Sequence, residues 1–253
     1  MLAPRDLPDI AADVLARIRA RRPRVHCITN AVAQNFSANM LLAAGAVPSM
    51  TIATDEIAEF VSRADALLVN LGTLDPERRG AIELAVTTAA NRVPWVLDPV
   101  LVDRSAPRAA YAKALVARHP RAIRLNAEEF AALAGTTSTS LARYAQATAS
   151  TMGLTGDRDI VTDGTRIVAI ANGDPLMAKV TAMGCAASAI VAACHAVEPD
   201  AWLATAAGLT LIGVAGEIAA ANARGPGSFA VEILDALHGL DAATITQRAR
   251  LDP

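Results

Sequence analysis

Short apolar segments alternate with longer amphipathic segments along the first half of the chain. The apolar segments cover residues 24–28, 47–52, 66–72, 94–100 and 122–126. Apolar residues with helical spacing occur between them and before them, at residues 11–21, 32–44, 75–92 and 106–119. Because strands that are covered on both faces read as continuous apolar runs, this alternation predicts an α/β fold with a mostly parallel central sheet and helices on both faces.

Several helix ends are marked by residues that suit capping positions. Gly45 follows the helix predicted at residues 32–44, where a left-handed C-cap is expected. Asp75 is expected to cap the helix that continues with Pro76, because proline favours the first helical position. Thr54 is expected to open a further short helix.

The pattern changes in the second half of the chain. Residues 159–173 contain two β-rich runs around Asp163-Gly164, a dipeptide typical of hairpin turns, so we expect a hairpin at the edge of the sheet. From Gly184 onward the pattern is almost entirely helical. Since no repeat, low-complexity tract or linker interrupts the chain, we predict one domain over residues 1–253.

Composition places the chain among folded globular proteins. Of its 253 residues, 53% are apolar and 19% are charged, which predicts a sizeable core. A net charge of −2 gives no basic surface for nucleic acid, and no uninterrupted apolar run is long enough to predict a membrane partner. Residues 1–20 carry Arg5 and three aspartates, unlike a signal peptide, so we expect a cytoplasmic location.

Polar side chains follow the predicted strands. In open parallel sheets, ligands bind beyond the carboxyl ends of the strands, so residues at these ends are candidates for a site. The candidates are Asn30, Met50, Asn70, Gly72, Asp98, Arg124, Asn126, Thr155 and Gly156.

A loop before a small-residue helix is a further candidate. In the segment KVTAMGCAASA, residues 179–189, the helix is expected to begin near Cys185. The free N–H groups and positive dipole end of such a helix favour an anion. Loops that bind phosphate usually contain several glycines, which let the phosphate approach the backbone closely, and here Gly184 is the only glycine of the segment. The residues alone leave two interpretations open, an anion-binding loop or a turn into a core helix in which Cys185 is a small buried hydrophobe.

Eight segments in order identify a family resemblance. They are HCITN, NFSANMLLAAGAVPSM, DALLVNLGTL, VLDPV, IRLNAEEFAALAG, VTDG, PLMAKVT and GPGSF. Together, from about Pro23 to Phe229, they resemble the hydroxyethylthiazole kinase family of the ribokinase-like superfamily. The resemblance implies ATP- and Mg²⁺-dependent phosphorylation of the primary alcohol of 4-methyl-5-(2-hydroxyethyl)thiazole, a salvage step toward thiamine. It also implies a homotrimer whose thiazole sites lie at subunit interfaces.

The resemblance also implies roles for residues that bind the two substrates. Met50 matches a methionine that contacts the thiazole, and Asn30 lies in the matching loop near the same substrate. Ala182 stands at a substrate-binding position of the loop before the last helical region. Arg124 and Thr155 match positions that contact ATP.

Four more residues match the phosphate and metal side of the family's site. Asn126 and Glu129 fit an N-x-x-E pattern that holds magnesium and its waters near the nucleotide phosphates, and Asp98 matches an acidic residue beside them. Cys185 occupies the position of the general base. A helix N-terminus lowers the pKa of a thiol, so we expect Cys185 to be able to take the proton of the alcohol.

Each of these residues also has a structural interpretation. Asn126 could be only a helix N-cap, and Glu129 could belong to a solvated helix face. Met50 could belong to the core, and Asp98 could end its strand in a turn before proline.

Two loops depart from the family pattern, which leaves three functional hypotheses. Where the family has a T-G-T-G-C loop, this chain has Ala182 in place of the first glycine and Met183 in place of the second threonine. Where the family has a glycine-rich stretch, this chain has residues 101–108, of which Leu101–Ser105 differ in particular. The first hypothesis is the thiazole kinase itself. The second is a kinase of another small alcohol, with a pocket reshaped by Leu101, Asp103 and Met183. The third is a non-catalytic protein that binds small molecules or nucleotides, which the presence of the candidate base at position 185 disfavours.

Overall fold

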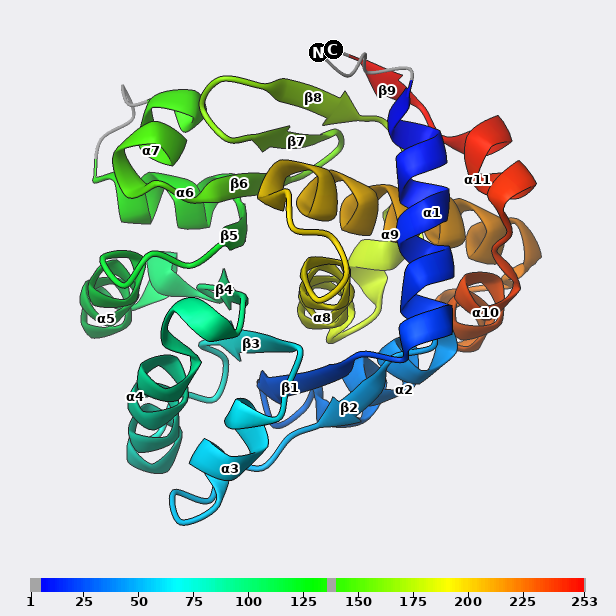
Figure 1. Cartoon of the computed structure of the whole chain (residues 1–253). Helices are drawn as coiled ribbons and strands as arrows, with labels where there is room; N and C mark the ends of the chain where they lie inside the picture. Colours follow the sequence, from blue (N-terminus) through cyan, green and yellow to red (C-terminus); the bar gives the residue numbers. More distant parts are fainter. Residues whose placement is uncertain (1–5, 136–139, 253) are drawn as a thin grey trace.

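The computed structural model describes residues 6–135 and 140–252, and it contains one nine-stranded sheet (Figure 1). Its first six strands in spatial order are parallel and the last three pair antiparallel. In spatial order the strands are β2 (Val47–Ser49), β1 (Arg24–Ile28), β3 (Ala66–Asn70), β4 (Trp95–Asp98), β5 (Ala122–Asn126), β6 (Thr151–Thr155), β7 (Asp159–Thr162), β8 (Ile167–Ile170) and β9 (Leu251–Asp252).

Helices cover both faces of this sheet (Figure 1). One layer contains α1 (Leu7–Arg21), α2 (Gln34–Ala44), α8 (Met183–His195), α9 (Ala201–Asn222), α10 (Pro226–Gly239) and α11 (Ala242–Arg248). The other contains α3 (Ile57–Ser62), α4 (Pro76–Ala89), α5 (Ala106–Val116), α6 (Ala127–Ala134) and α7 (Leu141–Thr148). Three short 3₁₀ helices cover Ala90–Arg92, Val102–Arg104 and Pro175–Lys179. The predicted fold class is confirmed.

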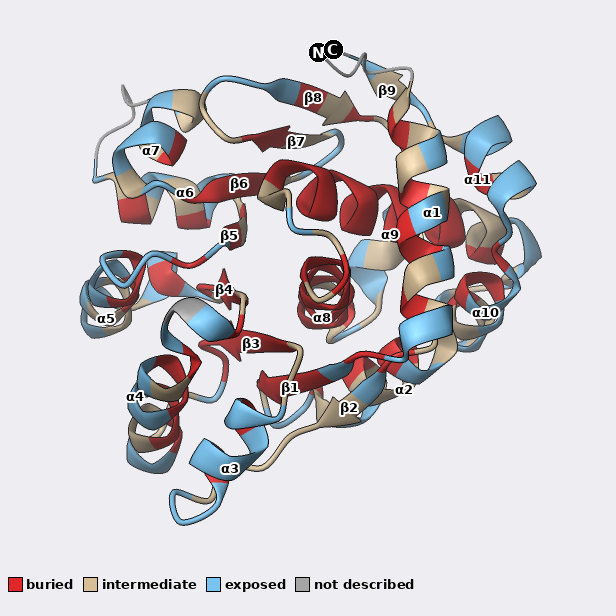
Figure 2. Ribbon diagram, in the orientation of Figure 1, coloured by how far each residue is buried: buried red, intermediate tan, exposed pale blue. Residues whose placement is uncertain are grey.

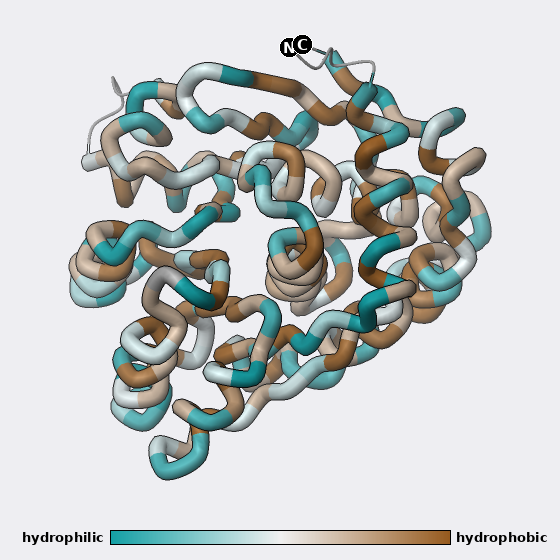
Figure 3. The backbone as a smooth tube through the Cα atoms, in the orientation of Figure 1, coloured by the Kyte–Doolittle hydropathy of each residue, from teal (hydrophilic) through white to brown (hydrophobic). Residues whose placement is uncertain are grey.

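The sheet separates two apolar cores. In β3 every residue is buried, and successive side chains point to opposite faces. Leu68 therefore joins the core of the α8 and α9 layer, whereas Leu67 and Val69 join the core of the α4 and α5 layer. Figure 2 shows the central strands β1, β3 and β4, together with α8 and much of α9, as buried, and Figure 3 shows hydrophilic positions on the outer turns of the surrounding helices.

Most predicted helix caps and the predicted hairpin are confirmed. Gly45 ends α2 in a left-handed conformation with φ +97°. The side chain of Asp75 accepts a hydrogen bond from the backbone N–H of Arg78 at 2.7 Å, as expected for an N-cap. Asp163 and Gly164 lie in the turn between β7 and β8, where Gly164 has φ +93°.

Two predicted boundaries are wrong. The strand expected over residues 47–52 ends at Ser49, which leaves Met50 just beyond it. Thr54 does not cap the next helix, because α3 begins only at Ile57. The C-terminal region is almost entirely helical, as expected, and the one strand described there, β9, pairs with β8 through Ala169 and Asp252. This pairing depends on a tertiary contact, which local sequence patterns do not report.

The long apolar helix α9 belongs to the core. By length and composition alone it could cross a membrane, but 83% of its most apolar window is buried inside the protein. Its neighbour α8 approaches it closely, because a Cβ at Gly208 would lie only 2.9 Å from the Cα of Val191. Glycine at this position therefore sets the distance between α9 and the helix that begins at the candidate site.

Gly208→Ala is expected to lower the free energy of unfolding by about 1–3 kcal/mol, because the added methyl group overpacks the contact between α8 and α9. Urea unfolding followed by circular dichroism measures this effect. Gly227→Ala is the matched control, since an added Cβ there meets no atom within 4 Å. Equal stability of the Gly208→Ala variant and the unchanged protein would show that the two helices can move apart at no cost.

Candidate active site

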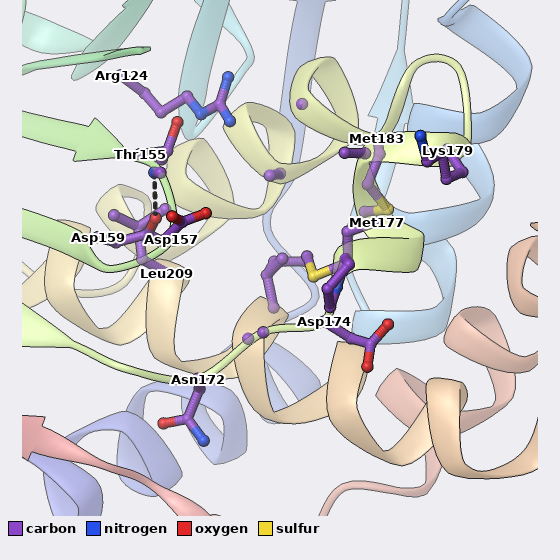
Figure 4. Close-up of a pocket in the computed structure, with 18 residues that line it drawn as sticks. Arg124, Thr155, Asp157, Asp159, Asn172, Asp174, Met177, Lys179, Met183 and Leu209 are labelled. Atoms are coloured by element: carbon purple, nitrogen blue, oxygen red, sulfur yellow. Dashed lines mark hydrogen bonds between the residues drawn. The ribbon is translucent and has the colours of Figure 1, made fainter. Parts of the chain in front are cut away.

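A pocket of about 760 Å³ lies beyond the carboxyl ends of β5 and β6 (Figure 4). Arg124 and Thr155 extend into it from the two strand ends. Its other walls come from the loop after β6, the segment after β8, the start of α8 and the middle of α9, including Asp157, Asp159, Asn172, Asp174, Met177, Lys179, Met183, Gly184, Leu209 and Ile212. The structure therefore brings together the two residues that were predicted to bind ATP.

The guanidinium group of Arg124 faces the first turn of α8. Its Nε is buried and has no hydrogen-bond partner among the described residues. A Cβ at Gly184 would lie 3.0 Å from its Nη1, so glycine allows the helix start to approach the cation. A buried unpaired donor beside a helix N-terminus is a favourable position for an anion, in agreement with the anion-loop interpretation.

The altered loop keeps a backbone that suits glycine. Ala182 has φ +70° and precedes α8, which begins at Met183, two residues before the expected start. A left-handed alanine costs about 1–2 kcal/mol relative to its preferred conformations. Met183 is buried in the core and also lines the pocket, so its side chain occupies space beside the anion loop.

Asp98 lies at the end of β4 with no exposed surface. Its Oδ2 accepts hydrogen bonds from Asn70 Nδ2 and from Ser188 Oγ, both at 2.7 Å. Its Oδ1 is buried and has no partner among the described residues. Burial raises the pKa of Asp98 to about 6, although the positive charge of Arg124 opposes this shift.

The expected low pKa of Cys185 is wrong. The thiol lies in the first turn of α8 and is buried, and burial together with the negative charge of Asp98 raises its pKa to about 12. Desolvation therefore outweighs the three effects that lower this pKa, which are a hydrogen bond with the side chain of Asn70, the positive charge of Arg124 and a backbone hydrogen bond of Cys185 itself. The thiol is protonated near neutral pH in this structure.

The N-x-x-E pattern forms a capping box. Asn126 caps α6 by accepting a hydrogen bond from Glu129 N at 2.8 Å, and Glu129 Oε2 accepts from Asn126 N at 2.9 Å. Glu129 Oε1 also accepts from Leu101 N at 3.0 Å. Glu129 is buried, so the alternative of a solvated helix face is wrong, whereas the N-cap interpretation of Asn126 is confirmed.

The second altered loop is tied to Glu129. Leu101 is left-handed with φ +60°, and the 3₁₀ helix Val102–Arg104 follows it. Arg108 Nη1 donates to the carbonyl oxygens of Leu71 at 2.8 Å and Val100 at 3.0 Å, which holds the ends of β3 and β4 together. The loop that begins at Leu101, which stands where the family has a glycine-rich stretch, is thus held by hydrogen bonds from its backbone to Glu129 and from Arg108 to neighbouring carbonyl groups.

The available carboxylates fit a magnesium ion that is also bound by phosphates. Among residues 6–135 and 140–252 there is no group of three or more His, Cys, Asp or Glu side chains that could hold a metal by themselves. Mg²⁺ usually binds through one or two carboxylates together with substrate phosphates and water. The unpaired Oδ1 of Asp98 and the remaining lone pairs of Glu129 suit that arrangement.

Met50 and Asn30 lie apart from this pocket, since neither lines it. Met50 is partly buried against the core that includes α2 and α8. His26, a buried residue of β1, bonds to both neighbours of Met50, through Nδ1 to Ser49 Oγ at 2.8 Å and through Nε2 to the carbonyl oxygen of Thr51 at 3.1 Å. Sequence analysis assigned His26 no role, because only the register of β1 and β2 reveals this contact.

A second cavity, of about 890 Å³, lies at the opposite end of the sheet. Three of its four arginines stand at or just beyond the ends of α1, α4 and α5, namely Arg21, Arg92 and Arg118. The fourth, Arg121, donates a hydrogen bond to the carbonyl oxygen of Pro199. Cations at helix C-termini balance the partial negative charge of the last carbonyl groups. These positive charges therefore have a structural explanation without a ligand.

The sheet, its antiparallel edge and the position of the pocket define a ribokinase-like fold. A solved ribokinase-like superfamily protein from Enterococcus faecalis superposes with a TM-score of 0.66 at 16% identity, over 89% of this chain and 93% of that one, which is a likeness of fold alone. The chain belongs to the hydroxyethylthiazole kinase family, whose model matches residues 15–243.

Individual relatives agree with this assignment. A probable hydroxyethylthiazole kinase from Agrobacterium fabrum is 43% identical over 243 residues, which cover 96% of this chain and 94% of the relative. The solved hydroxyethylthiazole kinase from Pyrococcus horikoshii superposes with a TM-score of 0.92 at 35% identity, over 96% of this chain and 98% of that one. The predicted family and the enzyme class, a phosphotransferase acting on an alcohol, are confirmed. The roles of the individual site residues stay predictions.

Glu129→Gln is expected to lower the free energy of unfolding by about 1–3 kcal/mol even without Mg²⁺ or nucleotide, because an amide NH₂ would then face one of the two backbone donors. Urea unfolding in a chelating buffer measures the effect. Glu128→Gln, at the exposed neighbouring position, is the control and should change little. If Glu129→Gln unfolds at the same urea concentration as the unchanged protein, the capping box contributes nothing and Glu129 is free to serve the metal alone.

Proposed function

We propose that this protein transfers the γ-phosphoryl group of ATP to the primary alcohol of 4-methyl-5-(2-hydroxyethyl)thiazole, a salvage step toward thiamine, and that it does so in the cytoplasm as one domain. Membership of the family supports the substrate. The observation that carries the proposal is a pair of buried groups that find no hydrogen-bond partner in the described part of the chain, the donor Nε of Arg124 and the acceptor Oδ1 of Asp98. Such groups are expected where charged ligands complete the hydrogen bonding.

The pocket supports ATP as the phosphoryl donor. Arg124 can form two parallel hydrogen bonds to a phosphate, which a point charge such as lysine cannot. Thr155 lies at the next strand end, and Met177, Leu209 and Ile212 provide an apolar wall that suits a nucleotide base. Asn126 acts on the nucleotide only indirectly, through the capping box that sets the start of α6.

Asp98 and Glu129 are the residues that would hold magnesium, which would neutralise negative charge on the phosphates and on the carboxylates. Neutralising Asp98 removes one of the two causes that raise the pKa of Cys185. To act as the base, Cys185 first gives its own proton to solvent, because its thiol is protonated near neutral pH. The thiolate then takes the proton of the alcohol while the alcohol oxygen attacks the γ-phosphorus, and the bond from that phosphorus to the oxygen of the β-phosphate breaks, which releases ADP. Since phosphoryl transfer depends mostly on positioning and charge, a thiolate that is present only in a small fraction of the molecules is sufficient.

An oligomer would complete the thiazole site. Met50 and Asn30 lie near β2, an edge strand of the sheet. Val32, Leu42 and Val47, on and around α2 and β2, expose between 37% and 67% of their surface. Exposed apolar side chains beside an unpaired strand edge are typical of an interface between copies. We therefore include in the proposal a homotrimer in which Met50, Asn30 and Ala182 contribute to thiazole sites at the interfaces.

ADP release from ATP and Mg²⁺ over a panel of small alcohols tests the activity. Ala182→Gly relieves the left-handed alanine, and Met183→Thr returns a hydroxyl donor, so the double variant should turn over the thiazole about tenfold faster or more. Adding Cys185→Ala to this variant should abolish the gain if Cys185 is the base.

Other outcomes would favour the alternative functions. Turnover of a different alcohol by the natural protein, with no gain on the thiazole in the double variant, would identify a kinase of that alcohol. The presence of Met183 in the lining of the pocket is the observation that favours this alternative. Ligand binding by calorimetry without ADP release from any alcohol would identify a binding protein.

Light scattering is expected to give a mass of three chains. Leu42→Glu should yield smaller species and a higher KM for the thiazole, because a charge would be buried at the interface. Leu84→Glu is the matched control, since Leu84 is 42% exposed on α4, away from β2. A stable monomer with full activity on the thiazole would contradict the shared site.

A further inference from the structure

The C-terminal segment of the chain holds one wall of the nucleotide pocket. That wall is formed by residues 172–175, which leave β8 and lead into the 3₁₀ helix Pro175–Lys179. The strand β9 pairs with β8 directly before this wall. The pairing continues at Ala171, whose N–H donates to the carbonyl oxygen of Arg250 at 2.9 Å.

Asn172 binds the C-terminal segment with its whole amide group. Its Oδ1 accepts from Arg250 N at 2.7 Å, and its Nδ2 donates to the carbonyl oxygen of Arg248 at 2.9 Å and to Glu217 Oε1 at 3.1 Å. The residue is buried, and α9 approaches it so closely that a Cβ at Gly213 would lie 2.7 Å from its Cβ. The position of Asn172 is therefore fixed from two sides.

Glu217 connects the same segment to the next residue of the wall. It lies on α9, where its Oε1 accepts from the backbone N–H of Gly173 at 3.1 Å. Its Oε2 accepts from Arg250 Nη1 at 3.2 Å, and Arg250 Nη2 donates to the carbonyl oxygen of Ala171 at 2.7 Å. Gly173 has φ +137°, so the backbone adopts a turn there that side chains rarely allow.

This turn places the residues that follow it. The side chain of Asp174 accepts from Leu176 N at 2.8 Å and so caps the 3₁₀ helix. Met177 and Lys179 lie on that helix and line the pocket. Met177 packs against α9, because a Cβ at Gly216 would lie 2.6 Å from its sulfur. A shift of residues 172–174 would therefore move the whole wall.

We infer that Asn172 and Glu217 are positioning residues for the nucleotide. They connect the paired strands β8 and β9 to residues 172–179 and so hold these residues in the wall of the pocket. The inference rests on the proposed function, in which this pocket holds ATP. Loosening the wall weakens nucleotide binding more than thiazole binding, because Met50 and Asn30, two of the three residues proposed for the thiazole site, lie outside the pocket.

The test compares Glu217→Ala with the conservative Glu217→Gln, in the full chain. Calorimetry with ADP as the probe measures nucleotide affinity without turnover, and steady-state kinetics give the KM for ATP, the KM for the thiazole and kcat. Glu217→Ala should raise the Kd for ADP and the KM for ATP about tenfold or more, because it removes the acceptor for Gly173 N and Asn172 Nδ2 together. Glu217→Gln keeps an acceptor oxygen and should restore most of the affinity.

Two further variants keep the test decisive. Arg250→Ala changes a largely exposed side chain, so it should fold, and it should raise the KM for ATP by a smaller factor than Glu217→Ala. Thr246→Val is the matched control, because it removes a contact of the same C-terminal region, from Thr246 Oγ1 to Asp9 Oδ1, on the side of α1. Its KM for ATP should not change.

The outcomes separate this inference from the proposed function. A lower melting temperature of Glu217→Ala with an unchanged Kd for ADP would overturn the inference alone, since the network would then be merely structural. An equal rise in the KM for ATP and for the thiazole would overturn it as well. Failure of the unchanged protein to bind ADP would overturn the nucleotide assignment of the pocket, and the inference with it.

Discussion

The hydrogen bond from Ser188 Oγ to Asp98 Oδ2 attaches α8 to the end of β4, and the arrangement of the site depends on it. Asp98 is fully buried, so its charge requires donors from the protein. Ser188 supplies one from α8, and Asn70 supplies the other from β3. With α8 held in this way, its first turn faces Arg124 and places Cys185 beside Asp98.

The parts of the fold that follow local rules could be predicted from the sequence. Strand and helix alternation, the cap at Asp75 and the hairpin at Gly164 depend on residues close in the chain, and the structure contains all of them. The strand β9 was missed because two residues carry no periodic signal and pair only through a tertiary contact. The raised pKa of Cys185 was missed for a related reason, since desolvation depends on packing that composition does not report.

The two loops that depart from the family pattern keep strained backbones. Ala182 and Leu101 are both left-handed, and each lies in a loop where the family pattern has glycine. Strain of this kind persists when the surrounding structure determines the backbone. Leu101 is held by Glu129, and Ala182 is held between the segment before α8 and the first turn of the helix. The substitutions therefore change side chains at the site more than they change its backbone.

The two edges of the sheet, at β2 and at β9, differ in what covers them. At one edge, β9 pairs with β8, and Arg250 N in the C-terminal segment donates to Asn172 Oδ1 in the wall of the pocket, so that this pocket is built within one chain. At the other edge lies β2, with exposed apolar side chains nearby and Met50 just beyond it. His26 fixes both neighbours of Met50, so this segment is rigid although it lies at an open edge. A rigid contact residue beside an uncovered apolar edge is the arrangement that a second copy of the chain could complete without rearranging the first.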